Sequence, residues 1–300
     1  MKFFDIFSES WKNYKDNFPA ILIIFFFLSI IPSIILSFIG LPMVNLSQQE
    51  VTKFYMTNQG ILYLTVSLAL FFVSILMTAC FVFLSLNAEK KLKAKEIFSG
   101  ALKYWGRYIL LIVFIYLIMF VLFIPALIST FVLLSKYDAT LQTMAAASMN
   151  NLAILTMLLF VLGIILAIVF LVRRSLSIIV MMKEDKKVLA SLKRSKELVA
   201  GKFWKLFGYF ILLVIILILI SFVFIFVGNL INGFTGNVIK DTSVTPVKTT
   251  LTTAGYYIAL IFSLASSLVT TALSLFFLKN LYSALISENK AEIKTDKKKK

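Results

Sequence analysis

The chain has 300 residues, 60% of them hydrophobic, whereas a typical soluble domain is about 45–50% apolar. Its 30 Lys and Arg residues outnumber 14 Asp and Glu residues, which makes the formal net charge +16, and it contains no histidine. This composition excludes an ordinary soluble domain, and it lacks the residue type that most often serves as a general base or metal ligand.

Six apolar segments follow one another along the chain. A helix needs about 20 residues to cross roughly 30 Å of hydrocarbon, and each segment is long enough. Strands of a membrane barrel would alternate in hydrophobicity over about 9–11 residues, and these segments do not. The first segment is too long for the apolar core of a signal peptide, so we expect it to be retained. We therefore predict an all-α integral membrane protein with one six-helix domain over residues 1–286. The predicted spans are residues 18–39, 61–86, 108–134, 152–172, 206–231 and 256–278.

Basic residues gather in alternate connections between these spans. The N-terminal segment, the second-to-third connection, the fourth-to-fifth connection and the C-terminal tail together hold 26 Lys and Arg residues. The other three connections hold 4, namely Lys53, Lys136, Lys240 and Lys248. Because short basic loops stay on the cytoplasmic side during insertion, we predict that both termini are cytoplasmic. Residues 287–300 are then a basic, solvated tail.

An amphipathic segment precedes the first, third and fifth spans. Apolar residues recur there at steps of three, four or seven, as on one face of a helix. All three tryptophans, Trp11, Trp105 and Trp204, fall in or beside these segments, at the depth where indole rings prefer to lie. Such helices either anchor the protein at the interface or bind a particular anionic lipid or partner. Their shared order predicts a threefold pseudo-repeat with a period of about 90–100 residues. The predicted faces are Phe3, Phe7, Trp11, Tyr14 and Phe18, then Phe98, Leu102, Trp105 and Ile109, then Leu192, Val199, Phe203 and Leu206.

Candidate binding residues are basic and lie at the cytoplasmic ends of spans. Arg173 and Arg174 close the fourth apolar segment, where they either extend to the headgroups or form an anion site in a cytoplasmic vestibule. Together with Arg194 and the three tryptophans, they are our candidate contacts for an anionic lipid or another anion. The charge lies between apolar runs, which favours an anionic membrane surface over nucleic acid as the partner.

The sequence carries no recognisable catalytic motif. It contains no phosphate-binding loop, no histidine-based zinc motif and no Cys–His pair, and its one cysteine, Cys80, lies in an apolar run. We therefore predict no enzymatic activity, no cofactor and no metal.

A sequence pattern before the fifth span resembles a known family. The pattern consists of Leu192, Arg194, Ser195, Leu198, Gly201, Phe203, Trp204 and Gly208, within a matching stretch of about 40 residues. It is similar to that of six-span bacterial and archaeal proteins related to the membrane domain of glycerophosphodiester phosphodiesterases. The resemblance implies the plasma membrane of a bacterium or archaeon, and it assigns no catalytic residue to this pattern. The phosphodiesterase module itself needs histidines, which this chain lacks.

Three functional hypotheses follow. The first is a non-enzymatic membrane protein in envelope or lipid homeostasis, or a scaffold or immunity-type factor. The second is a small transporter or flippase component for an amphipathic or anionic molecule, which requires a polar cavity between the first, fourth and sixth spans. The third, a membrane-embedded enzyme, lacks acid–base pairs to support it.

Overall fold

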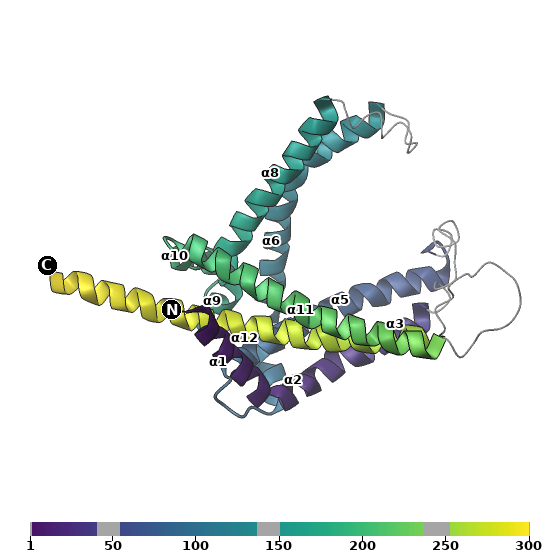
Figure 1. Ribbon diagram of the computed structural model, residues 1–300, viewed down its shortest axis with the longest axis horizontal. Helices are drawn as coiled ribbons and strands as arrows, with labels where there is room; N and C mark the ends of the chain where they lie inside the picture. Colours follow the sequence, from purple (N-terminus) through teal and green to yellow (C-terminus); the bar gives the residue numbers. More distant parts are fainter. Residues whose placement is uncertain (1, 41–54, 137–150, 237–252, 300) are drawn as a thin grey trace, which may run out of the picture. The chain divides into compact units, whose positions relative to one another are not determined.

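The computed structural model describes residues 2–40, 55–136, 151–236 and 253–299, and every regular element in these ranges is a helix. Six helical segments are long and apolar enough to cross a membrane, so the predicted all-α, six-span fold is confirmed and the chain is a multi-pass membrane protein. Figure 1 shows the helices α1 (Phe3–Asp16), α2 (Phe18–Phe25), η1 (Phe26–Ile30), α3 (Ile31–Gly40), α5 (Asn58–Leu86), α6 (Ala94–Lys136), α8 (Asn151–Arg174), α9 (Ser177–Lys183), α10 (Val188–Val199), α11 (Phe203–Gly236) and α12 (Thr253–Lys299).

The spans agree with the prediction in number and order but differ at their ends. The third differs most, because α6 runs without a break from Ala94 and includes the predicted amphipathic segment. Half of the fourteen residues from 94 to 107 are good helix formers and none is proline, so nothing in the segment ends the helix before the span begins. The observed spans are Phe18–Leu36, Asn58–Leu86, Ala94–Leu133, Ala153–Lys183, Phe203–Ile231 and Leu260–Asn289.

The helices group into two compact units. We call residues 1–105 with 208–300 the terminal unit, and residues 106–207 the central unit. The single domain predicted over residues 1–286 and the threefold repeat stay predictions. The external connections predicted at 41–60, 136–151 and 232–255 fall largely outside the described residues.

The core of the terminal unit lies where α5 packs against α12. Both helices bury aromatic side chains completely, among them Phe81 and Phe276. The helix α1 packs on α12, and the ring of Phe3 lies 5.5 Å from that of Phe277 and 5.6 Å from that of Tyr209. Phe3 lies outside the membrane spans, and removing such a side chain from water contributes about 1.5–3 kcal/mol. The helix α1 is therefore held by protein contacts along one side.

The buried face of α1 differs from the predicted aromatic face. The buried residues are Phe3, Ile6, Ser10 and Tyr14, spaced by three, four and four positions. Trp11 lies beside this face and is 39% exposed. Ser10 lies on the buried face although it is polar, and its hydroxyl accepts a hydrogen bond from the side-chain amide of Asn280 on α12. Hydrophobicity alone could not predict this, since the contact is made by a polar residue.

The helix changes at two points, one directly before the first span and one within it. Asn17 ends α1, and its side-chain nitrogen donates to the carbonyl of Asn13 at 2.9 Å and to that of Ala88 at 3.1 Å. The π-helical turn η1 comes directly before Pro32, which lacks the N–H that would bond to Leu28. A π turn is a known way to accommodate such a gap. The irregular turn therefore lies beside a residue that cannot complete the α-helical bonding pattern.

The central unit contains an antiparallel pair of helices, α6 and α8. The hydroxyl oxygens of Ser129 and Thr156 lie 2.5 Å apart in the buried contact. Near them, Gly163 lets the ring of Phe123 approach, because an added Cβ would lie 3.0 Å from that ring. Small and hydroxyl residues of this kind are typical of helix contacts within membranes.

The apolar run after Arg174 forms a separate short helix, α9. Six of its seven residues, Ser177 to Met182, are buried, and α9 packs against α10. The hydroxyls of Ser175 and Ser177 donate to the carbonyls of Val172 at 2.9 Å and Arg174 at 2.7 Å. These bonds satisfy carbonyls that the end of α8 leaves without helical partners. The backbone can therefore change direction between α8 and α9 although the residues of α9 are buried.

The backbone of the C-terminal tail is helical, because α12 continues to Lys299. Lys and Glu make up seven of the thirteen residues from 287 to 299, and both favour a helix. Lysines also stabilise a helix C-terminus through its dipole.

Candidate anion-binding site

The two arginines at the end of α8 contact protein groups. The guanidinium of Arg173 lies 6.0 Å from the ring centre of Phe203, and that of Arg174 lies 5.9 Å from the ring centre of Phe170. Arg174 also donates to the carbonyl oxygen of Leu192 on α10. Positive charge is favourable here because the carboxyl end of a helix carries partial negative charge. Both arginines are thus held in place by neighbouring helices.

The helix α10 docks on the end of α8 through Ser195. Its hydroxyl donates to the carbonyl oxygen of Arg173 at 3.0 Å, which satisfies another carbonyl of the helix end. Leu192 and Leu198 on the same side of α10 are buried. Three positions of the family-like pattern are therefore explained by one helix contact.

A cleft of about 220 Å³ lies where α6, α8 and α10 meet. Each helix contributes side chains at spacings that place them on one face. The two lining residues of α6 are four positions apart, as are the two of α8. The four lining residues of α10 lie at positions i, i+3, i+4 and i+7. The lining residues are Phe114 and Ile118 from α6, Phe170 and Arg174 from α8, and Leu189, Leu192, Lys193 and Lys196 from α10.

The polar lining of this cleft is entirely basic. Arg174, Lys193 and Lys196 supply three formal positive charges, and no carboxylate is among the lining residues. Among the described residues, neither Lys193 nor Lys196 forms an ion pair, and both side chains are exposed. The remaining walls are apolar. The cleft can hold an anionic group next to a hydrocarbon segment.

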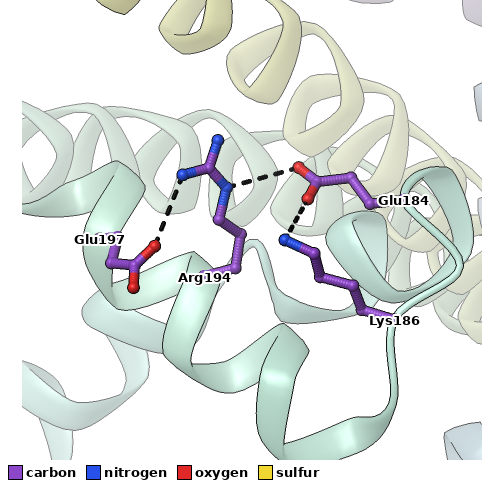
Figure 2. A network of polar contacts seen from close by, with 4 residues as sticks. All are labelled: Glu184, Lys186, Arg194 and Glu197. Carbon is purple, nitrogen blue, oxygen red and sulfur yellow. Dashed lines mark hydrogen bonds and ion pairs between the residues drawn. The ribbon is translucent and has the colours of Figure 1, made fainter.

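The third predicted arginine, Arg194, points to carboxylates. Figure 2 shows its guanidinium between Glu184 and Glu197, with nitrogen–oxygen distances of 3.7 Å and 3.5 Å. Glu184 also pairs with Lys186 at 2.7 Å. Two carboxylates near one guanidinium offset its charge. Arg194 therefore fixes the turn between α9 and α10, and it does not line the cleft.

The same turn is tied to α6. Arg107 donates to Asp185 at 2.7 Å. Asp185 adopts a left-handed backbone conformation with a φ of 48°, which Asp tolerates better than most residues. Since both side chains are well exposed, the pair contributes little to stability and serves to orient the turn.

The three tryptophans have different environments. Trp11 stacks on Tyr14 at 5.5 Å, and Trp204 is 77% exposed beside Phe203 at 5.3 Å. Trp105 is more enclosed than the other two at its indole N–H. Its nitrogen is buried and has no hydrogen-bond partner among the described residues. None of the three lines the basic cleft.

The rest of the family-like pattern forms the joint between α10 and α11. Gly201 has a φ of 78°, a conformation that L side chains rarely adopt and that glycine allows where α10 ends. Phe203 stacks on Phe207 with ring centres 6.1 Å apart. Gly208 is different, because a Cβ added there meets no atom within 4 Å.

No family model matches the chain, and the searches of curated proteins and of solved structures give no match. The resemblance to the phosphodiesterase membrane domains stays a prediction.

Sequence reasoning found Arg174 but missed Lys193, Lys196 and the apolar wall. The available signal was the spacing of Leu189, Leu192, Lys193 and Lys196 on one face of α10. It did not stand out because ten basic residues crowd the stretch from Arg173 to Lys205.

Proposed function

We propose that this membrane protein binds an anionic phospholipid through the cleft of Arg174, Lys193 and Lys196, and that it acts without catalysis in envelope or lipid homeostasis. One observation carries the proposal. The cleft is lined by three positively charged side chains and by apolar residues, and no carboxylate is among its lining residues. A phosphate accepts hydrogen bonds from arginine and lysine, and these bonds are strengthened by charge.

The size and the walls of the cleft favour a lipid over a free anion. A volume of about 220 Å³ is below the roughly 300–1,000 Å³ of pockets that enclose a whole ligand. It suits a headgroup phosphate. The acyl chain would then lie along α6, where Phe114 and Ile118 line the cleft and Leu117 is exposed.

The proposed orientation places this cleft on the cytoplasmic side of a bacterial or archaeal plasma membrane. The distribution of 26 and 4 basic residues supports it. Anionic lipids attract basic groups at that surface, with about 1 kcal/mol for each Lys or Arg.

The test is lipid binding to the delipidated full-length protein in detergent, followed by native mass spectrometry. Phosphatidylglycerol is titrated, with phosphatidylcholine as the zwitterionic comparison. The variant Lys193→Gln/Lys196→Gln removes two exposed charges from the cleft and leaves Arg174 in its packed position. We expect its apparent Kd for phosphatidylglycerol to rise at least tenfold.

The matched control is Lys90→Gln/Lys91→Gln, which removes the same charge from exposed positions outside the cleft. We expect less than a twofold change. An equal loss in both variants, or equal binding of both lipids to the unaltered protein, would contradict the proposal. The transporter hypothesis stays a prediction that a flux assay in vesicles can address.

A further inference from the structure

A second cleft, of about 560 Å³, lies between α1 and α12 in the terminal unit. Its α1 side carries Lys2, Asp5, Ile6 and Glu9, and its α12 side carries Asn280, Ser283, Ala284, Ser287 and Glu288. The two sides come from opposite ends of the sequence. We propose that this cleft binds a primary ammonium group carried on a short aliphatic chain.

The first argument is charge. Three carboxylates and one ammonium line the cleft, so its formal charge is −2 in a chain with a net charge of +16. Asp5 and Glu9 are exposed, and neither forms an ion pair with another described residue. An acidic cleft on a basic protein selects cations.

The second argument is the buried amide of Asn280, which is 3% exposed. Its nitrogen donates to the hydroxyl of Ser10 at 3.0 Å, and that hydroxyl donates to the carbonyl of Ile6 at 2.6 Å. The amide oxygen of Asn280 is buried and accepts no hydrogen bond among the described residues. A buried acceptor without a donor is costly, by about 1–3 kcal/mol. A ligand with N–H groups would supply the missing donor.

The third argument is that the hydroxyl groups of the lining also act as acceptors. Ser283 donates to the carbonyl of Lys279 at 3.1 Å, and Ser287 donates to that of Ala284 at 2.8 Å. Each hydroxyl proton is thus donated to a carbonyl within α12, and the lone pairs of the hydroxyl oxygens are available to accept hydrogen bonds. An ammonium group has three donors and no acceptor, which matches this lining.

A metal ion fits less well than an organic cation. The described residues contain no group of three or more acidic, cysteine or histidine side chains placed to hold a metal. The cleft is also far larger than one ion, and Ile6 and Ala284 give it apolar surface for methylene groups.

Two sources can present this chemistry, a free aliphatic amine and the ethanolamine headgroup of a lipid. The first experimental arm titrates 1,4-diaminobutane into the full-length protein in detergent, measured by isothermal titration calorimetry. The second measures retention of phosphatidylethanolamine by native mass spectrometry. Tetramethylammonium and phosphatidylcholine are the comparison cations without N–H donors.

The test variant is Asp5→Asn/Glu9→Gln, which changes exposed residues only. Its control, Asp16→Asn/Glu89→Gln, removes the same charge at exposed positions outside the cleft. We expect binding in at least one arm, a tenfold or greater loss in the test variant, and less than a twofold change in the control. The variant Ser10→Ala/Asn280→Leu, which removes the buried acceptor, should lower affinity at least threefold.

Binding in the first arm identifies a free amine, and retention in the second identifies the lipid headgroup. Binding in neither arm, equal binding of tetramethylammonium, or equal loss in test and control variants would overturn the proposal.

Discussion

The side-chain amide of Asn280 donates a hydrogen bond to the hydroxyl of Ser10, with 3.0 Å between nitrogen and oxygen. This bond joins the first helix of the chain to the last at a buried position. Both groups would be costly to bury alone.

We predict that the two residues are energetically coupled. Ser10→Ala leaves the Asn280 amide without its acceptor and should lower the free energy of unfolding by about 1–3 kcal/mol. In Ser10→Ala/Asn280→Leu neither polar group remains, so the loss should be smaller than the sum of the two single changes. Denaturation in mixed micelles gives the free energy of unfolding of the unaltered protein, the two single variants and the double variant. Strict additivity would contradict the coupling.

The glycines of α6 offer a matched pair. A Cβ at Gly100 would overlap the ring of Phe83, whereas a Cβ at Gly106 meets no atom within 4 Å. We expect Gly100→Ala to destabilise by about 1–3 kcal/mol because the ring must move. We expect Gly106→Ala to be neutral or to stabilise by up to about 1 kcal/mol, since alanine favours a helix. Equal thermal unfolding temperatures for both variants would refute this packing of α5 and α6.

The joint before α11 gives a second pair. Gly201→Ala forces a side chain into the left-handed region at a φ of 78° and should cost about 1–2 kcal/mol. Gly208→Ala, within α11 and in open space, should be neutral or stabilising. The same unfolding assay distinguishes them. If Gly201→Ala is the more stable variant, the turn has another conformation.

The predicted topology can be tested with single cysteines in a Cys80→Ala background. A thiol reagent that cannot cross the membrane should label cysteines at positions 53 and 248 in sealed cells. It should label those at 193 and 297 only after lysis, because the basic connections are expected to stay inside. The opposite labelling pattern would contradict the predicted orientation and would show that the basic connections lie outside.

The sequence predicted the six spans because apolar length is a local property that tertiary contacts do not change. The turn at Gly201 and the π turn near Pro32 depend on single residues with unusual backbones, whereas Pro125 lies inside the unbroken helix α6. The buried face of α1 and the basic cleft could not be predicted. Both depend on which helices meet, and the decisive residues there, Ser10 and Lys196, resemble ordinary surface residues in the sequence.

The central claim is that an anionic lipid occupies the cleft of Arg174, Lys193 and Lys196. Photocrosslinking in native-like bilayers, with a phosphatidylglycerol analogue that carries a diazirine near its headgroup, tests this most directly. We predict that mass spectrometry places the crosslinks on the segments 114–118, 170–174 and 189–196, with an excess of unlabelled phosphatidylglycerol removing them. Even labelling along the exposed faces of α6, α8 and α11, without competition, would contradict the claim.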